Sequence, residues 1–251
     1  MKTIFVAGKD PQASRWYPVA RVQYDGLTFR LRYTKGAQCI AGFSGFGLMK
    51  ELEAEYQSST LFPLLRNRVL PRSRPESKDY LHWMGLHSDA DAFDELFRSG
   101  GLRATDSIEL VPLPIPTADG DYEAYFFLRG IGHLPGVTSE LTSSLSEGSR
   151  LFVLRDVQNE YDSTALLLRT GQPVSLVGYA PRYYSSDFSR LIEGAGATQA
   201  VVEVVRVNPG APSSYRVLCR MRAPWPSDFL PCQGEEYEPL GDFRFSGSAW
   251  D

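Results

Sequence analysis

The segment Asn159 to Asp162 places an aromatic ring, Tyr161, beside a carboxylate, and Arg182 follows after two apolar runs. An aromatic face can stack on a base, Arg can bind phosphate, and Asp can accept a hydrogen bond from a sugar hydroxyl. Together these groups can hold the end of a single nucleic-acid strand. We find no comparable grouping for bond-making chemistry, so the sequence predicts a binding protein.

Other candidates for chemistry lack the partners they need. Ser44 lies one residue out of register for a G-x-S-x-G nucleophile elbow, and the chain has 3 histidines. His82 and His87 have no third metal ligand nearby. The alternating glutamates of 51–55 face different ways, which does not suit a Mg²⁺ site. We therefore expect no catalytic residues, no metal site and no cofactor, and the chain is not expected to be an enzyme.

The composition is that of an ordinary globular protein, with 43% hydrophobic and 22% charged residues. No window approaches the length of a membrane-spanning helix, and the N-terminal apolar run is too short for a signal peptide. Three scattered cysteines, without a C-x-x-C pair, are typical of a reduced protein. We expect a cytoplasmic protein with no membrane partner.

The net charge of −4 is unevenly distributed. Residues 1–118 carry 15 Lys and Arg against 13 Asp and Glu, and residues 122–226 carry 10 against 9. The segment 227–251 has six acids and only Arg244. Every cation of 122–226 is Arg, which suits phosphate binding and stacking but also fits an Arg-rich composition bias.

The alternating prolines of 112–116 predict an extended connector. We therefore expect three parts, which are a domain at 1–118, a domain at 122–226 and an acidic, aromatic-containing tail at 227–251. The tail can dock on a basic groove, bind a partner, or be loosely ordered.

In the first part, residues 19–33 predict a hairpin that turns at Asp25-Gly26. A helix is expected over 76–84, closed by Gly85. Asp89 or Asp91 can cap a second helix that ends at Gly100-Gly101, and a strand should follow at 107–111.

The second part reads mainly as strands. Alternation predicts one apolar face with Tyr215, Val217, Cys219 and Met221. A helix is expected over 187–193. Six short strands with a helix predict a small β-barrel, and the whole chain is expected to be α+β. The strands are expected at 124–130, 150–155, 164–170, 174–179, 200–207 and 214–222.

The second part resembles the HIRAN domain, a small OB-like β-barrel found in some DNA-repair translocases and alone in bacterial proteins. The resemblance covers about residues 122–225. It implies a domain that binds single-stranded DNA at its 3′-hydroxyl end. The matching segments are residues 128–133 (LRGIGH), 151–156 (LFVLRD), 159–162 (NEYD) and 177–182 (VGYAPR).

The resemblance also implies roles for individual residues. Tyr161 would stack on or flank the terminal base, and Asp162 would accept a hydrogen bond from the terminal hydroxyl. Arg182 would contact phosphate, and Tyr215 would pack against a second base. His133 replaces an aromatic residue of the family. The remaining expected site residues, from the matching segments, are Asn159, Arg129 and Tyr179.

The match departs from the family at two positions. Gly132 stands where the best-studied members have Arg, and Tyr179 stands where they have His. Other interpretations also remain for single residues: Asp162 can brace a turn, Tyr161 and Tyr215 can be core aromatics, and Arg182 can be a solvated loop residue.

The first part, over about residues 19–112, is similar to the small N-terminal subdomain of HipA-type kinases. The resemblance rests on residues 61–71, Leu86, 93–97 and 100–106. It implies a protein-docking module without catalytic residues, with a HipA-like kinase as a possible partner. The alternative function is therefore an antitoxin-like regulator of such a kinase, with nucleic-acid binding secondary.

Overall fold

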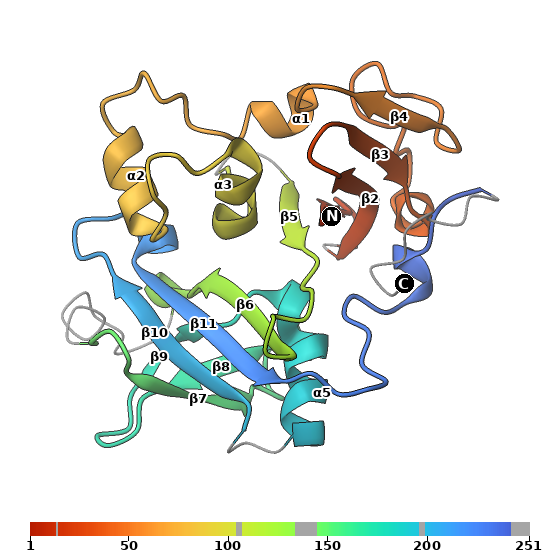
Figure 1. Ribbon diagram of the computed structural model, residues 1–251. Coiled ribbons are helices and arrows are strands. Elements are labelled where there is room, and N and C mark those ends of the chain that lie inside the picture. Colours follow the sequence, from red (N-terminus) through yellow and green to blue (C-terminus); the bar gives the residue numbers. More distant parts are fainter. Residues whose placement is uncertain (14, 104–106, 134–144, 196–198, 242–251) are drawn as a thin grey trace. The chain divides into compact units, whose positions relative to one another are not determined.

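The computed structural model describes residues 1–13, 15–103, 107–133, 145–195 and 199–241. The chain forms two compact units, each built from non-contiguous segments. Unit 1 consists of Met1–Pro71, Asp91–Leu113 and Pro231–Asp251, and unit 2 consists of Arg72–Ala90 and Pro114–Leu230. Figure 1 labels most helices and strands of both units.

Unit 1 contains a five-stranded antiparallel sheet in the order β4-β3-β2-β1-β5. Ile4 and Leu31 of the sheet and Phe93 and Leu96 of helix α3 belong to its buried core. The strands are β1 (Lys2–Lys9), β2 (Trp16–Tyr24), β3 (Phe29–Tyr33), β4 (Glu55–Ser58) and β5 (Ile108–Pro112). The helices are α1 (Pro63–Arg66) and α3 (Ala92–Ser99), with 3-10 turns η1 (Lys35–Cys39) and η5 (Glu235–Tyr237).

Local signals predicted two elements of unit 1 correctly. The carboxylate of Asp25 accepts a hydrogen bond of 2.9 Å from the Thr28 amide, which holds the turn between β2 and β3. Helix α3 begins after Asp91, whose side chain accepts a bond of 2.7 Å from the Asp94 amide, and it ends at Gly100. The predicted hairpin and the second predicted helix are therefore confirmed.

Part of the predicted C-terminal tail is packed as a component of unit 1. Lys35 forms ion pairs with Glu235 at 3.2 Å and with Glu238 at 2.7 Å. The amide of Leu240 donates to the carbonyl of Tyr33 at 2.9 Å, and the Leu240 side chain is buried. The acids of this segment therefore neutralise a lysine of unit 1.

Unit 2 contains a curled six-stranded antiparallel sheet in the order β6-β11-β10-β7-β8-β9, with few helices (Figure 1). This half-barrel agrees with the predicted α+β, OB-like fold. The strands are β6 (Asp121–Phe127), β7 (Arg150–Arg155), β8 (Leu166–Arg169), β9 (Leu176–Tyr179), β10 (Val201–Val207) and β11 (Val217–Pro224). The helices are α2 (Ser77–Trp83) and α5 (Ser185–Ala195), with 3-10 turns η2 (Ile131–His133), η3 (Arg182–Tyr184) and η4 (Ser213–Tyr215).

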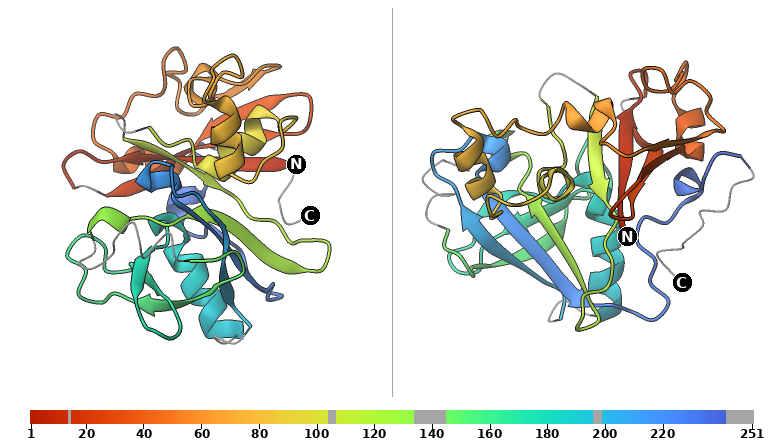
Figure 2. Two further views of the ribbon diagram at one scale, coloured as in Figure 1. Left: turned by 90° about the vertical axis from the view of Figure 1, so that its left-hand side faces the viewer. Right: turned by 45° about the horizontal axis from the view of Figure 1, so that its top comes forward.

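A backbone bridge joins the two edge strands of this sheet, β6 and β9. Arg129, just after β6, exchanges two backbone hydrogen bonds of 2.8 Å with Tyr179 at the end of β9. Gly178, next to that bridge, has φ +154°. A Cβ there would lie 2.9 Å from the Arg129 carbonyl oxygen and 3.1 Å from Cβ of Leu128. The close approach of the two strands therefore requires glycine at this position. Figure 2 shows the curled sheet from two further directions.

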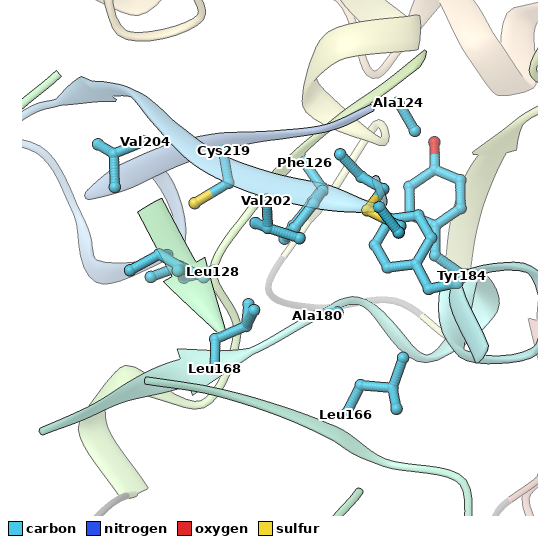
Figure 3. Close-up of a cluster of buried hydrophobic side chains, with 14 of the residues drawn as sticks. Ala124, Phe126, Leu128, Leu166, Leu168, Ala180, Tyr184, Val202, Val204 and Cys219 are labelled. Atoms are coloured by element: carbon cyan, nitrogen blue, oxygen red, sulfur yellow. The ribbon is translucent and has the colours of Figure 1, made fainter. Parts of the chain in front are cut away.

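The core of unit 2 lies on the concave face of the sheet (Figure 3). Val217, Cys219 and Met221 of β11 point into it and are fully buried, as their alternation predicted. Phe188 and Leu191 of α5 pack against them. Burial raises the pKa of the Cys219 thiol, so this cysteine is an apolar core residue.

Helix α2 covers apolar residues on the other side of the same sheet. Met84, just after α2, is fully buried and packs in one cluster with Leu81, Phe127 and Leu218. The side-chain amide of Asn208 donates to the Trp83 carbonyl at 3.0 Å. The helix predicted over 76–84 is therefore present, but it belongs to unit 2.

The observed units differ from the predicted domains at 1–118, 122–226 and 227–251. The segment 72–90 joins unit 2 because its apolar residues complete the cluster of α2, β6 and β11. The segment 231–241 joins unit 1 through ion pairs and backbone bonds. Among the described residues, none of the helices has both the length and the apolar character needed to cross a bilayer.

Candidate functional site

The turn between β7 and β8 is organised by the side chain of Asn159. Its Oδ1 accepts hydrogen bonds from the amides of Tyr161, at 3.0 Å, and Asp162, at 2.9 Å. Its Nδ2 donates to Oδ2 of Asp156 at 3.1 Å. Asn commonly fixes turns by such bonds to the backbone two residues on. Asn159 therefore sets the conformation that presents the next residues of the turn.

Tyr161 projects from this turn with 89% of its surface exposed. A ring this exposed contributes little to a core, so the alternative of a core aromatic does not apply to Tyr161. A large exposed aromatic on a fixed turn is available to stack on a planar ligand.

Asp162 has a structural role that uses one of its oxygens. Oδ1 accepts hydrogen bonds from the Thr164 amide at 2.9 Å and from the Thr164 hydroxyl at 2.7 Å. Within the described part of the chain, no protein partner is seen for Oδ2. A carboxylate oxygen can accept more than one hydrogen bond. The turn-bracing interpretation and a ligand contact are therefore compatible in Asp162.

Tyr179 connects β9 to the same turn. Its hydroxyl donates to Oδ2 of Asp156 at 2.7 Å, so this carboxylate receives bonds from both Tyr179 and Asn159. These two donors hold the pKa of Asp156 below its ordinary value. Burial and the Asp156 carboxylate raise the pKa of the Tyr179 phenol. The pair thus keeps an anion and a neutral phenol together at neutral pH.

Replacing Tyr179 with Phe should weaken the acid sensitivity of the fold. The pKa of Asp156 is depressed from 3.8 in the folded protein, so its hydrogen bonds stabilise the fold above that pH. This stabilisation is lost as the pH falls through the lower folded-state pKa. Removing the phenol donor brings the folded pKa nearer 3.8 and reduces the loss.

Thermal melts at pH 7 and pH 3 measure this effect. The difference in Tm between the two pH values should be smaller in Tyr179→Phe than in the native protein. Tyr161→Phe, which changes an exposed hydroxyl, is the control and should leave the difference unchanged. An equal difference in both variants would contradict the assigned role of the Tyr179–Asp156 bond.

The structure brings five predicted site residues into one region: Asn159, Tyr161 and Asp162 on the turn, Tyr179 bonded to it through Asp156, and Arg129 bridged to Tyr179. Arg182 is exposed and opens turn η3, three residues after Tyr179. His133 ends η2, and its side chain lies outside the described residues.

Tyr215 has a packing environment that its predicted strand position did not indicate. It lies in the 3-10 turn η4, before β11 begins, so it is not part of the apolar alternation of that strand. Its ring stacks on Trp83 at 6.2 Å between centroids and meets Tyr80 and Phe127 edge-on at 5.4 and 5.2 Å. These ring contacts give Tyr215 a packing role, and its predicted contact with a base stays a prediction.

Asp156 is a member of the site that the sequence prediction omitted. The sequence contained a signal, because Asp156 precedes Asn159 by three residues at the end of a predicted strand, where turn bonds are common. Its bond to Tyr179 joins residues 23 apart and has no local signature. Within the described residues, no group of three or more His, Cys, Asp or Glu side chains is placed to hold a metal ion.

Residues 122–225 match the family model of the HIRAN domain, which supports a HIRAN domain in unit 2. A crystal structure of a protein from Lactobacillus plantarum, a structural genomics target, is 15% identical and has a TM-score of 0.31. The match covers 41% of this chain and 99% of that one. A crystal structure of the HIRAN domain of human HLTF is 14% identical, with a TM-score of 0.29 and coverage of 42% and 80%.

The HIRAN assignment of residues 122–225 rests on the family model. The comparison with curated proteins found no match. The similarity of residues 19–112 to the HipA subdomain stays a prediction.

Proposed function

We propose that unit 2 binds single-stranded DNA at its 3′-hydroxyl end, through the turn of residues 159–162 and the neighbouring Tyr179. A HIRAN domain at residues 122–225 indicates nucleic acid as the partner of this unit. The observation that carries the proposal is the exposed Tyr161 ring next to Asp162, on a turn that side-chain hydrogen bonds hold in place.

Each group on this surface has a distinct task in the proposed complex. Tyr161 stacks on the terminal base, a contact worth about 1–3 kcal/mol per base. Oδ2 of Asp162 accepts the hydrogen bond of the terminal hydroxyl. Arg182, exposed on its loop, binds a backbone phosphate, and Arg129 adds positive charge beside Tyr179. Binding of this kind is modest in affinity and sensitive to salt.

The chemistry of the strand end tests the proposal directly. The native protein should bind a short single-stranded oligonucleotide with a 3′-hydroxyl at least tenfold more tightly than one with a 3′-phosphate, about 1.4 kcal/mol. The phosphate cannot donate the hydroxyl's hydrogen bond, and its charge is repelled by the Asp162 carboxylate. Fluorescence anisotropy at low salt measures both affinities.

Asp162→Asn is the matched variant for this experiment. It retains an oxygen for the two bonds from Thr164, so the turn is kept, but it removes the charge and replaces Oδ2 with a donor. In this variant, the ratio of the affinities for the 3′-hydroxyl and 3′-phosphate strands should therefore approach one. Equal binding of both ends by the native protein would remove the end-recognition role, and no binding at low salt would remove the DNA function altogether.

The proposal assigns no catalysis to this chain and gives unit 1 a protein-docking role. Support for docking comes from the resemblance of residues 19–112 to the HipA subdomain, with a HipA-like kinase as the candidate partner. Hydrolysis of DNA or nucleotides by the purified protein with Mg²⁺ would contradict the absence of catalysis. Failure of a co-expressed HipA-like kinase to copurify with the chain would count against the partner.

A further inference from the structure

The outer face of β7 and β8 presents an aromatic ring beside two guanidinium groups. Phe152 lies in mid-strand and is 37% exposed, whereas its neighbour Leu151 is buried in the core. Arg169, opposite Phe152 on β8, has its guanidinium carbon 4.7 Å from the ring centroid. The corresponding distance for Arg150 is 5.4 Å. The ring is therefore held at the surface with cations around it and is not required by the core.

This cluster is continuous with the Tyr179–Asp156 contact. Phe152 and Asp156 lie on one side of β7 and its extension, because side chains an even number of positions apart share a face. Leu154 lies between them and is opposite Leu167, which is in turn opposite Tyr179. At about 3.4 Å per residue, Phe152 is about 14 Å along the strand from Asp156. Leu154 and Leu167 thus form an apolar surface between the Phe152 ring and the Tyr179–Asp156 contact.

The outer face of β11 is chemically different, because its two arginines, Arg220 and Arg222, are matched by acids. Arg220 pairs with Glu203 and with Glu123, the latter at 3.2 Å. Arg222 pairs with Asp121 at 2.7 Å. These ion pairs neutralise the charges across neighbouring strands. Positive charge beside an exposed ring is therefore a feature of the β7–β8 part of the sheet.

We propose that Phe152 and Arg169 form a second stacking and phosphate subsite, along which the single DNA strand continues after its end is bound at residues 159–162. This inference rests on the proposed function and extends it from the strand end to the body of the strand. A base packs on the exposed part of the Phe152 ring, and Arg169 exchanges its contact with the ring for a backbone phosphate. Arg150 lies opposite Glu203 in the register, so Arg169 is the principal cation.

The chemistry of the face selects this occupant. A nucleic-acid strand offers flat apolar bases and negative phosphates in alternation, which an aromatic ring flanked by guanidinium groups complements. An exposed cation–π contact is weak, so a phosphate can displace the guanidinium from the ring easily. Aliphatic Leu154 and Leu167 allow the strand to cross between the two ends without a specific contact.

An oligonucleotide with abasic positions tests the base contact. Two ten-nucleotide DNA strands with 3′-hydroxyl ends are compared: one complete, the other abasic beyond the second nucleotide from the 3′ end. The native protein should bind the complete strand about tenfold more tightly, as expected for loss of one stacked base. Phe152→Ala should weaken binding of the complete strand by that factor and leave binding of the abasic strand unchanged.

Two controls separate this subsite from the end site and from general surface effects. Leu230→Ala removes an apolar side chain of the same 37% exposure and should change neither affinity. Tyr161→Ala should weaken both strands equally, because both keep the terminal bases. If the native protein binds both strands equally well, the second subsite is refuted while the proposed function stands. If it binds neither strand, the proposed function fails and the subsite with it.

The salt dependence tests the phosphate contact separately. Arg169→Ala should reduce the slope of log affinity against log salt concentration by about 0.7, the value for one phosphate contact of a single strand. Arg222→Ala, which removes an arginine paired with Asp121, should leave the slope unchanged. An unchanged slope in Arg169→Ala, or equal reductions in both variants, would refute the phosphate contact. Circular dichroism melts should show that all variants remain folded.

Discussion

Met84→Asp is expected to unfold unit 2. Met84 is fully buried where the α2 segment meets Phe127 and Leu218. A carboxylate there loses its hydration among apolar side chains, or it is expelled together with the helix. The expected loss exceeds about 4 kcal/mol, which is exceptional for one substitution. If residues 1–118 formed one domain, as the sequence predicted, the same substitution would destabilise that first domain instead.

Hydrogen exchange distinguishes these two outcomes because it reports on each strand separately. Amides of β10 and β11 should lose protection in Met84→Asp, while those of β2 and β3 in unit 1 should keep theirs. Met84→Leu, which nearly preserves the volume, should cost less than about 1.5 kcal/mol. If the amides of β11 stay protected in Met84→Asp, or if only amides of unit 1 lose protection, residues 72–90 are not an integral part of unit 2.

Gly178→Ala should destabilise unit 2 and damage the candidate site together. The φ of +154° at Gly178 disfavours any L side chain, and the added Cβ would lie 2.9 Å from the Arg129 carbonyl oxygen. Backbone strain of this kind costs about 1–3 kcal/mol before the steric clash is added. Relief of the clash must move Arg129 away from Tyr179, which breaks the bridge between the outer strands.

The expected result is a clear fall in Tm and a loss of DNA binding below the new Tm. Tyr179 carries both the bridge and the hydrogen bond to Asp156, so a shift of its backbone disturbs the turn at Asn159 as well. Gly132→Ala is the matched control, since a Cβ there meets no atom of the described residues within 4 Å, and it should change stability by less than about 0.5 kcal/mol. Similar Tm values for the two variants would contradict this role of Gly178.

Much of the fold was predictable because its signals are local. The turn at Asp25, the Asp91 cap and the alternation of β11 each depend on residues a few positions apart. Strand β1 was missed because it is buried at nearly every position, which gives a continuous apolar run without alternation. The apolar run of β1 was compared with a signal peptide and was not considered as a strand.

The least predictable feature was which distant segments pack against each other in the fold. Nothing in the composition of α2 states that Leu81 packs on Phe127 and Leu218, because this contact joins distant parts of the sequence. The same contact explains why Tyr215 is surrounded by rings. At the candidate site, a turn was expected between the strands predicted at 150–155 and 164–170. The bracing of this turn by Asn159 was not predicted, nor was the bond from Tyr179 to Asp156, which depends on the register of β9.

The exchange of segments between the units has a consequence for how the protein is made. Residues 72–90 are synthesised before β6 and β11, so the apolar side of α2 stays uncovered until those two strands have been made. Unit 1 obtains its last packed segment only after residue 230 has been synthesised. All segments of unit 2 have therefore been synthesised before unit 1 is complete.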